Sequence, residues 1–193
     1  MQVDQSKGQK QVVEYIKLAL EGLGLGDQFY SPQALEESAA RIAKVWIEMT
    51  EGIRQSVPEL KWFRTGFNGF LIKGPVESYF LCPHHLLPVS MSVLVGIVPK
   101  GYTLGISKIT RTVLWACKRL AIQEDILKLI ADTLWNVQEI YKPIGLVVGG
   151  VADHFCEKIR GVRHKSPTAV IEIRGLVKKE FLLLFDKRLK KGR

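Results

Sequence analysis

Apolar residues recur at helical spacing in the first fifty positions of the chain. Val12, Ile16, Leu20 and Leu23 follow the period of an amphipathic helix, and the glycines at positions 22, 24 and 26 end that pattern. Ser31-Pro32 is typical of a second helix start, because serine caps free backbone N–H groups and proline fits the first turn. We therefore expect two N-terminal helices before residue 52.

After Gly52 the pattern changes to that of strands. Residues 70–81 predict a strand pair or one bent strand around Gly74-Pro75. Residues 89–97 predict a strand, because large apolar residues at the odd positions alternate strictly with Ser90, Ser92, Leu94 and Gly96. Helical spacing returns over residues 107–117 and 122–137. Residues 146–152 and 168–173 predict two further strands, and residues 179–189 a last helix. The order strand–strand–helix–helix–strand–strand predicts an α+β fold in which two helices cover one face of an antiparallel sheet.

Length and composition predict the number of domains and the cellular compartment of the protein. The chain has 193 residues, 47% apolar and 24% charged, which predicts a single globular domain with an N-terminal helical part at 1–52 and a core at 66–193. Its three cysteines are widely spaced, its first ten residues are polar, and no run reaches the roughly 18 apolar residues of a membrane span. We expect a soluble cytoplasmic protein without a membrane anchor or a disulfide framework.

The net charge of +9 is concentrated at the C-terminus, where residues 174–193 hold eight basic and two acidic side chains. A protein that reads nucleic acid usually spreads its basic face over the fold. The distribution therefore favours a solvated face of the last helix, and nucleic-acid binding is the weaker alternative.

Cysteine and histidine gather in two clusters that predict a metal site. Cys82-Pro83-His84-His85 and His154-Phe155-Cys156 hold three of the four histidines of the chain. Thiolate and imidazole are the ligands that zinc prefers, and three protein ligands leave a position for water, as catalytic zinc requires. Cys82, His85 and Cys156 could form that set, which leaves His84 and His154 as proton carriers. The alternative is buried thiols beside incidental histidines, which two clusters in a chain with four histidines disfavour.

Two further features could contact a ligand, and the first of them suggests an anionic, phosphorylated one. Ser107, Lys108 and Arg111 stand at a predicted helix N-terminus, where free N–H groups and the helix dipole favour phosphate, and Arg160 follows the second cluster. Gln123-Glu124 opens the next helix, and a carboxylate there could accept two hydrogen bonds from guanine. On the residues alone, an ordinary acidic residue of the first helical turn, favoured by the helix dipole, is the stronger interpretation of Glu124.

Taken together, these motifs resemble the GTP cyclohydrolase I family in their order and spacing. The resemblance covers residues 34–184, and Pro83 stands where that family usually has glutamate. It implies the tunnelling fold, in which subunits associate through their sheets, and a homodecamer of two stacked pentameric rings with active sites between subunits. It also implies conversion of GTP and water into 7,8-dihydroneopterin triphosphate and formate, the first step toward tetrahydrofolate, another pterin or a deazapurine.

The resemblance also assigns roles to individual residues. It implies zinc as the cofactor, held by Cys82, His85 and Cys156, with His84 and His154 as the catalytic histidines. The residues implied to bind the substrate GTP are Gln123 and Glu124 at the guanine, and Ser107, Lys108, Arg111, Arg160, Arg41 and Lys44 at the ribose and triphosphate. The alternatives are a non-catalytic or regulatory nucleotide-binding relative and an enzyme that acts on a related nucleotide.

Overall fold

The computed structural model describes residues 5–191, which form two compact units that divide between Met49 and Thr50. The first unit holds helices α1 (Gln5–Gly22) and α2 (Pro32–Met49), joined by a short 3₁₀ turn, Gly26–Gln28. The predicted start of α2 is confirmed, because the Ala34 N–H donates to Ser31 Oγ at 3.1 Å. The two helices pack through a small apolar cluster that includes Ile16, Ala39 and Ala43.

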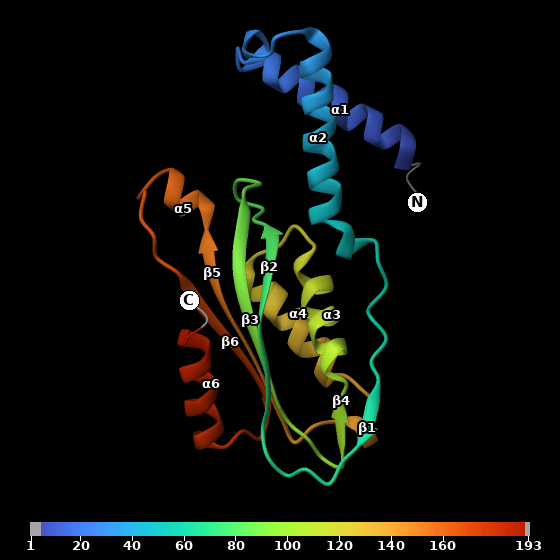
Figure 1. The fold of residues 1–193 in the computed structure, drawn as a ribbon, viewed down its shortest axis with the longest axis vertical. Coiled ribbons are helices and arrows are strands. Elements are labelled where there is room, and N and C mark those ends of the chain that lie inside the picture. Colours follow the sequence, from blue (N-terminus) through green and yellow to red (C-terminus); the bar gives the residue numbers. More distant parts are fainter. Residues whose placement is uncertain (1–4, 192–193) are drawn as a thin grey trace. The chain divides into compact units, whose positions relative to one another are not determined.

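The second unit is built on a four-stranded antiparallel sheet (Figure 1) with the order β2–β3–β5–β6. Its strands are β2 (Leu71–Leu81), β3 (Pro88–Val98), β5 (Gly145–His154) and β6 (Thr168–Gly175). The predicted bend near Gly74-Pro75 is a register shift between Lys73 and Val76 within one strand. The α+β class and its antiparallel sheet are therefore confirmed.

Helices α3 (Ile106–Cys117) and α4 (Gln123–Trp135) connect β3 to β5 and cover one face of this sheet. The strict alternation of β3 explains this arrangement, because side chains at i and i+2 share a face. The odd-numbered apolar residues of β3 and the even-numbered ones of β5 enter the main core with α3 and α4. This face holds the fold together and positions the start of α4 against the end of β5.

The last helix, α6 (Lys179–Lys191), packs on the opposite face of the sheet. Phe181, Phe185 and Leu189 enter a second apolar cluster with Leu94, Val147 and Val151. Two glycines make room for the rings. A Cβ added at Gly96 would lie 2.4 Å from Phe181 Cζ, and one added at Gly149 would lie 2.7 Å from Phe185 Cε1.

Short elements that the sequence did not predict complete the unit. Strands β1 (Trp62–Arg64) and β4 (Tyr102–Leu104) pair antiparallel as a separate two-stranded sheet. Helix α5 (Phe155–Ile159) follows β5 directly, and 3₁₀ turns cover Glu51–Ile53 and Glu139–Tyr141. Among the described residues, no helix combines the length and the apolar character needed to cross a membrane.

Candidate active site

The first cysteine–histidine cluster forms the loop between β2 and β3. Two backbone hydrogen bonds close this loop, from the Cys82 N–H to Leu87 O at 3.0 Å and from the Leu86 N–H to Cys82 O at 2.9 Å. Neither bond needs an N–H at position 83, so Pro83 fits the loop without the loss of a donor. Cys82 is buried, His84 and His85 are exposed, and Cys82 Sγ lies 3.2 Å from His84 Nδ1.

The second cluster comes to the same end of the sheet through strand register. Phe80 pairs with Val89 and Val89 with His154, so the last residue of β5 lies across β3 from the end of β2. The His154 ring meets the Phe80 ring edge to face, with 6.2 Å between centroids. Cys156 lies two residues further on, half-buried on α5. The two clusters, 70 positions apart in the chain, therefore share one end of the sheet.

The start of α4 completes this end of the sheet. The Gln123 side chain is only 2% exposed, and its Nε2 donates to Gly150 O and to Thr168 O, each at 3.1 Å. Its Oε1 lies 3.4 Å from His154 Nε2. Glu124, the next residue, is exposed in the first turn of α4. The sequence predicted the pair Gln123-Glu124 but not that their side chains would point to different environments.

The three predicted metal ligands belong to segments at one end of the sheet but do not converge in the structure. Within residues 5–191, no three histidine, cysteine, aspartate or glutamate side chains are close enough to hold a metal ion. The Cys82 thiol contacts His84 rather than His85. Two thiols and one imidazole fit zinc by their chemistry, and the common sheet end of Cys82 and His154 fits a shared site.

The basic residues of α3 lie at the other end of the sheet. The start of α3 adjoins β1, where the Gly105 N–H donates to Lys61 O at 2.9 Å. The chain that follows α3 adjoins the end of β2, since the Ala121 N–H donates to Leu81 O at 3.1 Å. Lys108 lies nine residues before Cys117, which is about 14 Å along a helix axis. The structure therefore does not bring Ser107 and Lys108 to the histidines of the same chain.

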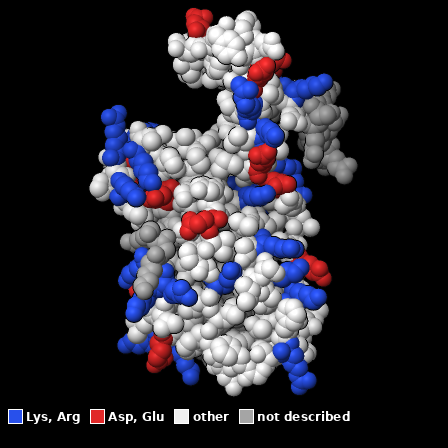
Figure 2. Space-filling model, in the orientation of Figure 1, with Lys and Arg blue, Asp and Glu red and all other residues white. Residues whose placement is uncertain are grey.

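The other predicted anion-binding residues have separate surroundings. Arg111 lines a hollow of about 260 Å³ with Gln55, Ser56, Pro58, Leu114, Trp115 and Lys118. Arg160 follows α5 directly and is exposed. Figure 2 shows Lys and Arg side chains near α5 and along α6. Arg41 and Lys44 lie on α2 in the first unit, where they are exposed and form ion pairs with Glu37 and Glu48 at 3.6 and 3.9 Å.

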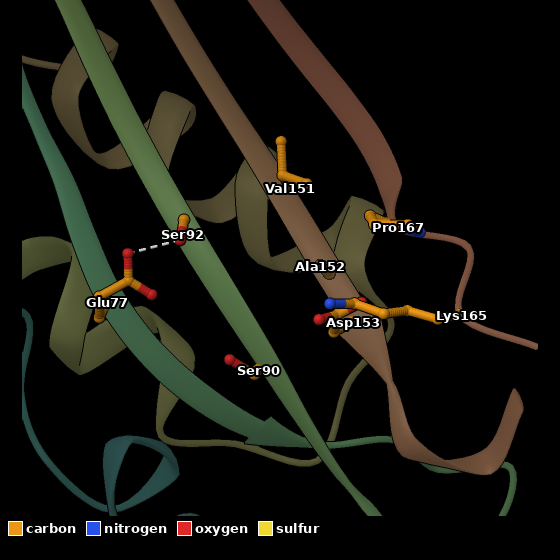
Figure 3. A pocket seen from close by; sticks show the side chains of 8 residues that line it. All are labelled: Glu77, Ser90, Ser92, Val151, Ala152, Asp153, Lys165 and Pro167. Atoms are coloured by element: carbon orange, nitrogen blue, oxygen red, sulfur yellow. Dashed lines mark hydrogen bonds between the residues drawn. The ribbon is translucent and has the colours of Figure 1, made fainter. Parts of the chain in front are cut away.

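A pocket that the sequence did not predict lies on the other face of the same sheet end (Figure 3). It has a volume of about 220 Å³, and its lining residues are Glu77, Ser90, Ser92, Val151, Ala152, Asp153, Lys165 and Pro167. Asp153 precedes His154 on β5, so strand alternation directs the two side chains to opposite faces. Asp153 pairs with Lys158 at 2.9 Å, which ties α5 to the end of β5.

Comparison with known proteins gives one family along most of the chain. Residues 16–183 match the family model described as GTP cyclohydrolase I. A protein named GTP cyclohydrolase 1 from Saccharolobus islandicus (strain L.S.2.15 / Lassen #1) is 35% identical over 188 residues, 92% of this chain and 88% of the relative. One of the same name from Hyperthermus butylicus is 35% identical over 178 residues, 91% of this chain and 84% of the relative.

A more distant protein and a solved structure also match. A GTP cyclohydrolase 1 from Clostridium kluyveri is 27% identical over 173 residues, 88% of this chain and 90% of the relative. The crystal structure of an archaeosine synthase QueF-Like in the apo form aligns with 64% of this chain and 100% of its own, at 19% identity and a TM-score of 0.37.

Proposed function

This chain belongs to the GTP cyclohydrolase I family, and on that premise we propose that it converts GTP and water into 7,8-dihydroneopterin triphosphate and formate. One observation carries the proposal beyond the family. The Cys82 loop, the His154–Cys156 segment and the Gln123-Glu124 pair are far apart in sequence, yet strand register and the start of α4 bring them to one sheet end. The product would be a precursor in the biosynthesis of tetrahydrofolate, another pterin or a deazapurine.

Cys82, His85 and Cys156 would hold a zinc ion in this proposal. Support comes from the donor chemistry and from the closed loop that holds Cys82 at the end of β2, across β3 from the end of β5 where His154 lies. When bound, zinc in an open three-ligand site lowers the pKa of a water molecule toward neutrality, which supplies hydroxide for attack on C8 of the purine.

His84 and His154 would carry protons on either side of this attack. C8 of guanine is a poor electrophile until N7 is protonated, and an imidazole can donate that proton near neutral pH. The later opening and rearrangement of the ribose also needs proton donors and acceptors at fixed positions. His154 suits this task, because the Phe80 ring and the Gln123 amide hold its imidazole between them.

Glu124 would bind the guanine edge. Its carboxylate can accept from N1–H and from the 2-amino group, and its exposed side chain at the start of α4 leaves it available to a ligand. Gln123 belongs to this end of the site through its contact with His154.

The triphosphate would be held by residues of more than one copy of the chain. Arg160 is at the histidine end, whereas Ser107 and Lys108 are at the opposite end, so we propose that a neighbouring copy supplies Ser107, Lys108 and Arg111. The outer edges of β2 and β6 have no partner strand among the described residues and could extend the sheet into the predicted homodecamer. The resemblance also assigns Arg41 and Lys44 to the triphosphate, and there each would exchange its ion pair with Glu37 or Glu48 for a phosphate oxygen.

The experiment that tests the reaction is incubation with GTP, followed by a formate assay and by oxidation and a scan for a fluorescent pterin. GTP binding without formate release would instead favour a non-catalytic nucleotide-binding relative. Zinc content should fall in Cys82→Ser and Cys156→Ser but not in Cys117→Ser, because Cys117 is a buried core thiol at the end of α3. His84→Ala and His154→Ala should keep zinc and lose turnover.

A mixed assembly tests whether the site is shared between copies. A His154→Ala chain and a Lys108→Ala chain should each be inactive alone. When the two are co-expressed in equal amounts, about one quarter of the sites would combine an intact half from each chain, and activity should return to that level. Continued inactivity of the mixture would mean that both residues act within one chain.

A further inference from the structure

The Gln123 side chain can adopt only one orientation. Both atoms that its amide group faces on the strand side are main-chain carbonyl oxygens, Gly150 O and Thr168 O, at 3.1 Å each. Carbonyl oxygens only accept hydrogen bonds, so the amide nitrogen must lie on that side and the amide oxygen on the other. A flipped amide would lose two donated bonds and would place its oxygen against two oxygens.

This orientation determines what His154 presents to Gln123. The fixed amide oxygen lies 3.4 Å from His154 Nε2 and can only accept. The favourable partner is an Nε2 that carries hydrogen, and a neutral imidazole with hydrogen on Nε2 has a bare Nδ1. Gln123 is 2% exposed, so water does not compete for its oxygen.

We propose that Gln123 is a positioning residue that holds neutral His154 as the Nε2–H tautomer and leaves Nδ1 as the nitrogen that exchanges protons with the substrate. This inference rests on the proposed function, in which His154 is a proton carrier. It differs from a guanine contact, because the two amide hydrogens and the amide oxygen of Gln123 all have partners within the chain. Glu124 then remains as the member of the pair that is free to touch the base.

The same geometry ties the orientation of His154 to the edge of the sheet. Gly150 lies within β5, and Thr168 is the first residue of the edge strand β6. The amide of Gln123 therefore joins α4 to two strands while its oxygen faces the imidazole. The donor side of the amide has a structural role and the acceptor side a chemical one, and substitutions can separate the two.

Two substitutions make this separation. Gln123→Met keeps the length of the side chain but removes both donors and the acceptor. Gln123→Glu removes the donors and keeps an acceptor toward His154. If the proposal holds, stability falls in both variants, whereas the Nε2–H tautomer is lost only in Gln123→Met. Ser78→Ala is the matched control, because Ser78 is also buried and donates to a strand carbonyl, Met91 O at 3.1 Å, without contact to His154.

The measurement is magic-angle-spinning NMR of the full-length protein, labelled with ¹⁵N-histidine and sedimented as assembled, at one mildly alkaline pH. Protonated and bare ring nitrogens of neutral imidazole give well-separated signals, and those of His154 are identified by their absence in His154→Asn. We expect protonated Nε2 and bare Nδ1 in the wild type, Gln123→Glu and Ser78→Ala, and a mixture of tautomers in Gln123→Met. In the same variant kcat should fall about tenfold or more with little change in KM for GTP.

Several outcomes would overturn the inference. A wild-type His154 with hydrogen on Nδ1 would do so directly, even if Gln123→Met failed to fold. An unchanged tautomer in Gln123→Met would do so as well, whatever happened to kcat. If the wild type released no formate from GTP but its tautomer followed the acceptor at position 123, the proposed function would fail and the positioning of His154 would stand.

Discussion

Replacement of Glu124 by glutamine tests the proposed guanine contact with little disturbance of the fold. Glu124 is exposed in the first turn of α4, and no hydrogen bond or ion pair engages its side chain among residues 5–191. The substitution keeps the size of the side chain and removes one negative charge. Within the chain it therefore costs only the interaction with the helix dipole, about 0.3–1 kcal/mol.

The expected effect on turnover is much larger. Glutamine would place an NH₂ group against a donor of the guanine edge, and one unpaired buried donor costs about 1–3 kcal/mol. Because about 1.4 kcal/mol corresponds to a factor of ten, kcat/KM for GTP should fall about 5- to 150-fold. The melting temperature should fall by no more than about 4 °C, and zinc content should not change.

Asp125→Asn is the matched control, because Asp125 is the other exposed acidic residue in the first turn of α4. It loses the same charge at the same helix end and should keep the turnover of the wild type. ATP is the substrate control, since adenine has an acceptor at N1 and no amino group at C2 where guanine has its two donors, and the wild type should reject it. Equal, small losses of kcat/KM in Glu124→Gln and Asp125→Asn would refute the guanine contact and leave Glu124 as a dipole partner.

Three further predictions concern stability. Burial raises the pKa of the Cys117 thiol to about 11. The stabilisation of the fold by the neutral thiol is therefore fully present below the unfolded pKa of about 8.5 and is lost as the pH rises toward 11. Over that window the free energy of urea unfolding should fall less in Cys117→Ala than in the wild type. The hydrogen bond from Lys128 contributes most to holding the pKa of Asp132 below its ordinary value. The ionised Asp132 carboxylate therefore stabilises the protein at neutral pH, and this contribution is lost in acid. Asp132→Asn should flatten the acid side of a plot of melting temperature against pH. Gly149→Ala would place a Cβ 2.7 Å from the Phe185 ring and should cost about 1–3 kcal/mol in urea unfolding, and an unchanged midpoint would contradict that close contact.

The sequence predicted the strands and helices wherever the apolar period was long. The alternation from Val89 to Ile97 indicated β3 and the side that faces α3 and α4. Strands β1 and β4 have three residues each, too few for a period to be visible. The face that α6 covers depends on room above Gly96 and Gly149, and that room exists only once the sheet has formed.

The candidate site was predictable in its members more than in their arrangement. The paired cysteine and histidine clusters predicted a metal site, and strand register places the ends of β2 and β5, which carry these clusters, at the same end of the sheet. The role of the Gln123 amide required the position of Thr168 on β6, which no local pattern specifies. The distance of Lys108 from His154 likewise follows from the direction of α3 along the sheet, because residue types alone do not encode direction.

The two glycines beneath α6 also constrain how this protein can change over generations. Every missense mutation of a glycine codon adds a side chain. At Gly96 and Gly149 the added Cβ would clash with the ring of Phe181 or Phe185, so each such mutation destabilises the protein whatever else it changes. The rings have the opposite freedom, since one base change converts phenylalanine to the smaller leucine or valine. Replacement of a ring by a smaller side chain before its glycine changes is therefore the less destabilising order of events. Lineages that keep both rings should keep both glycines.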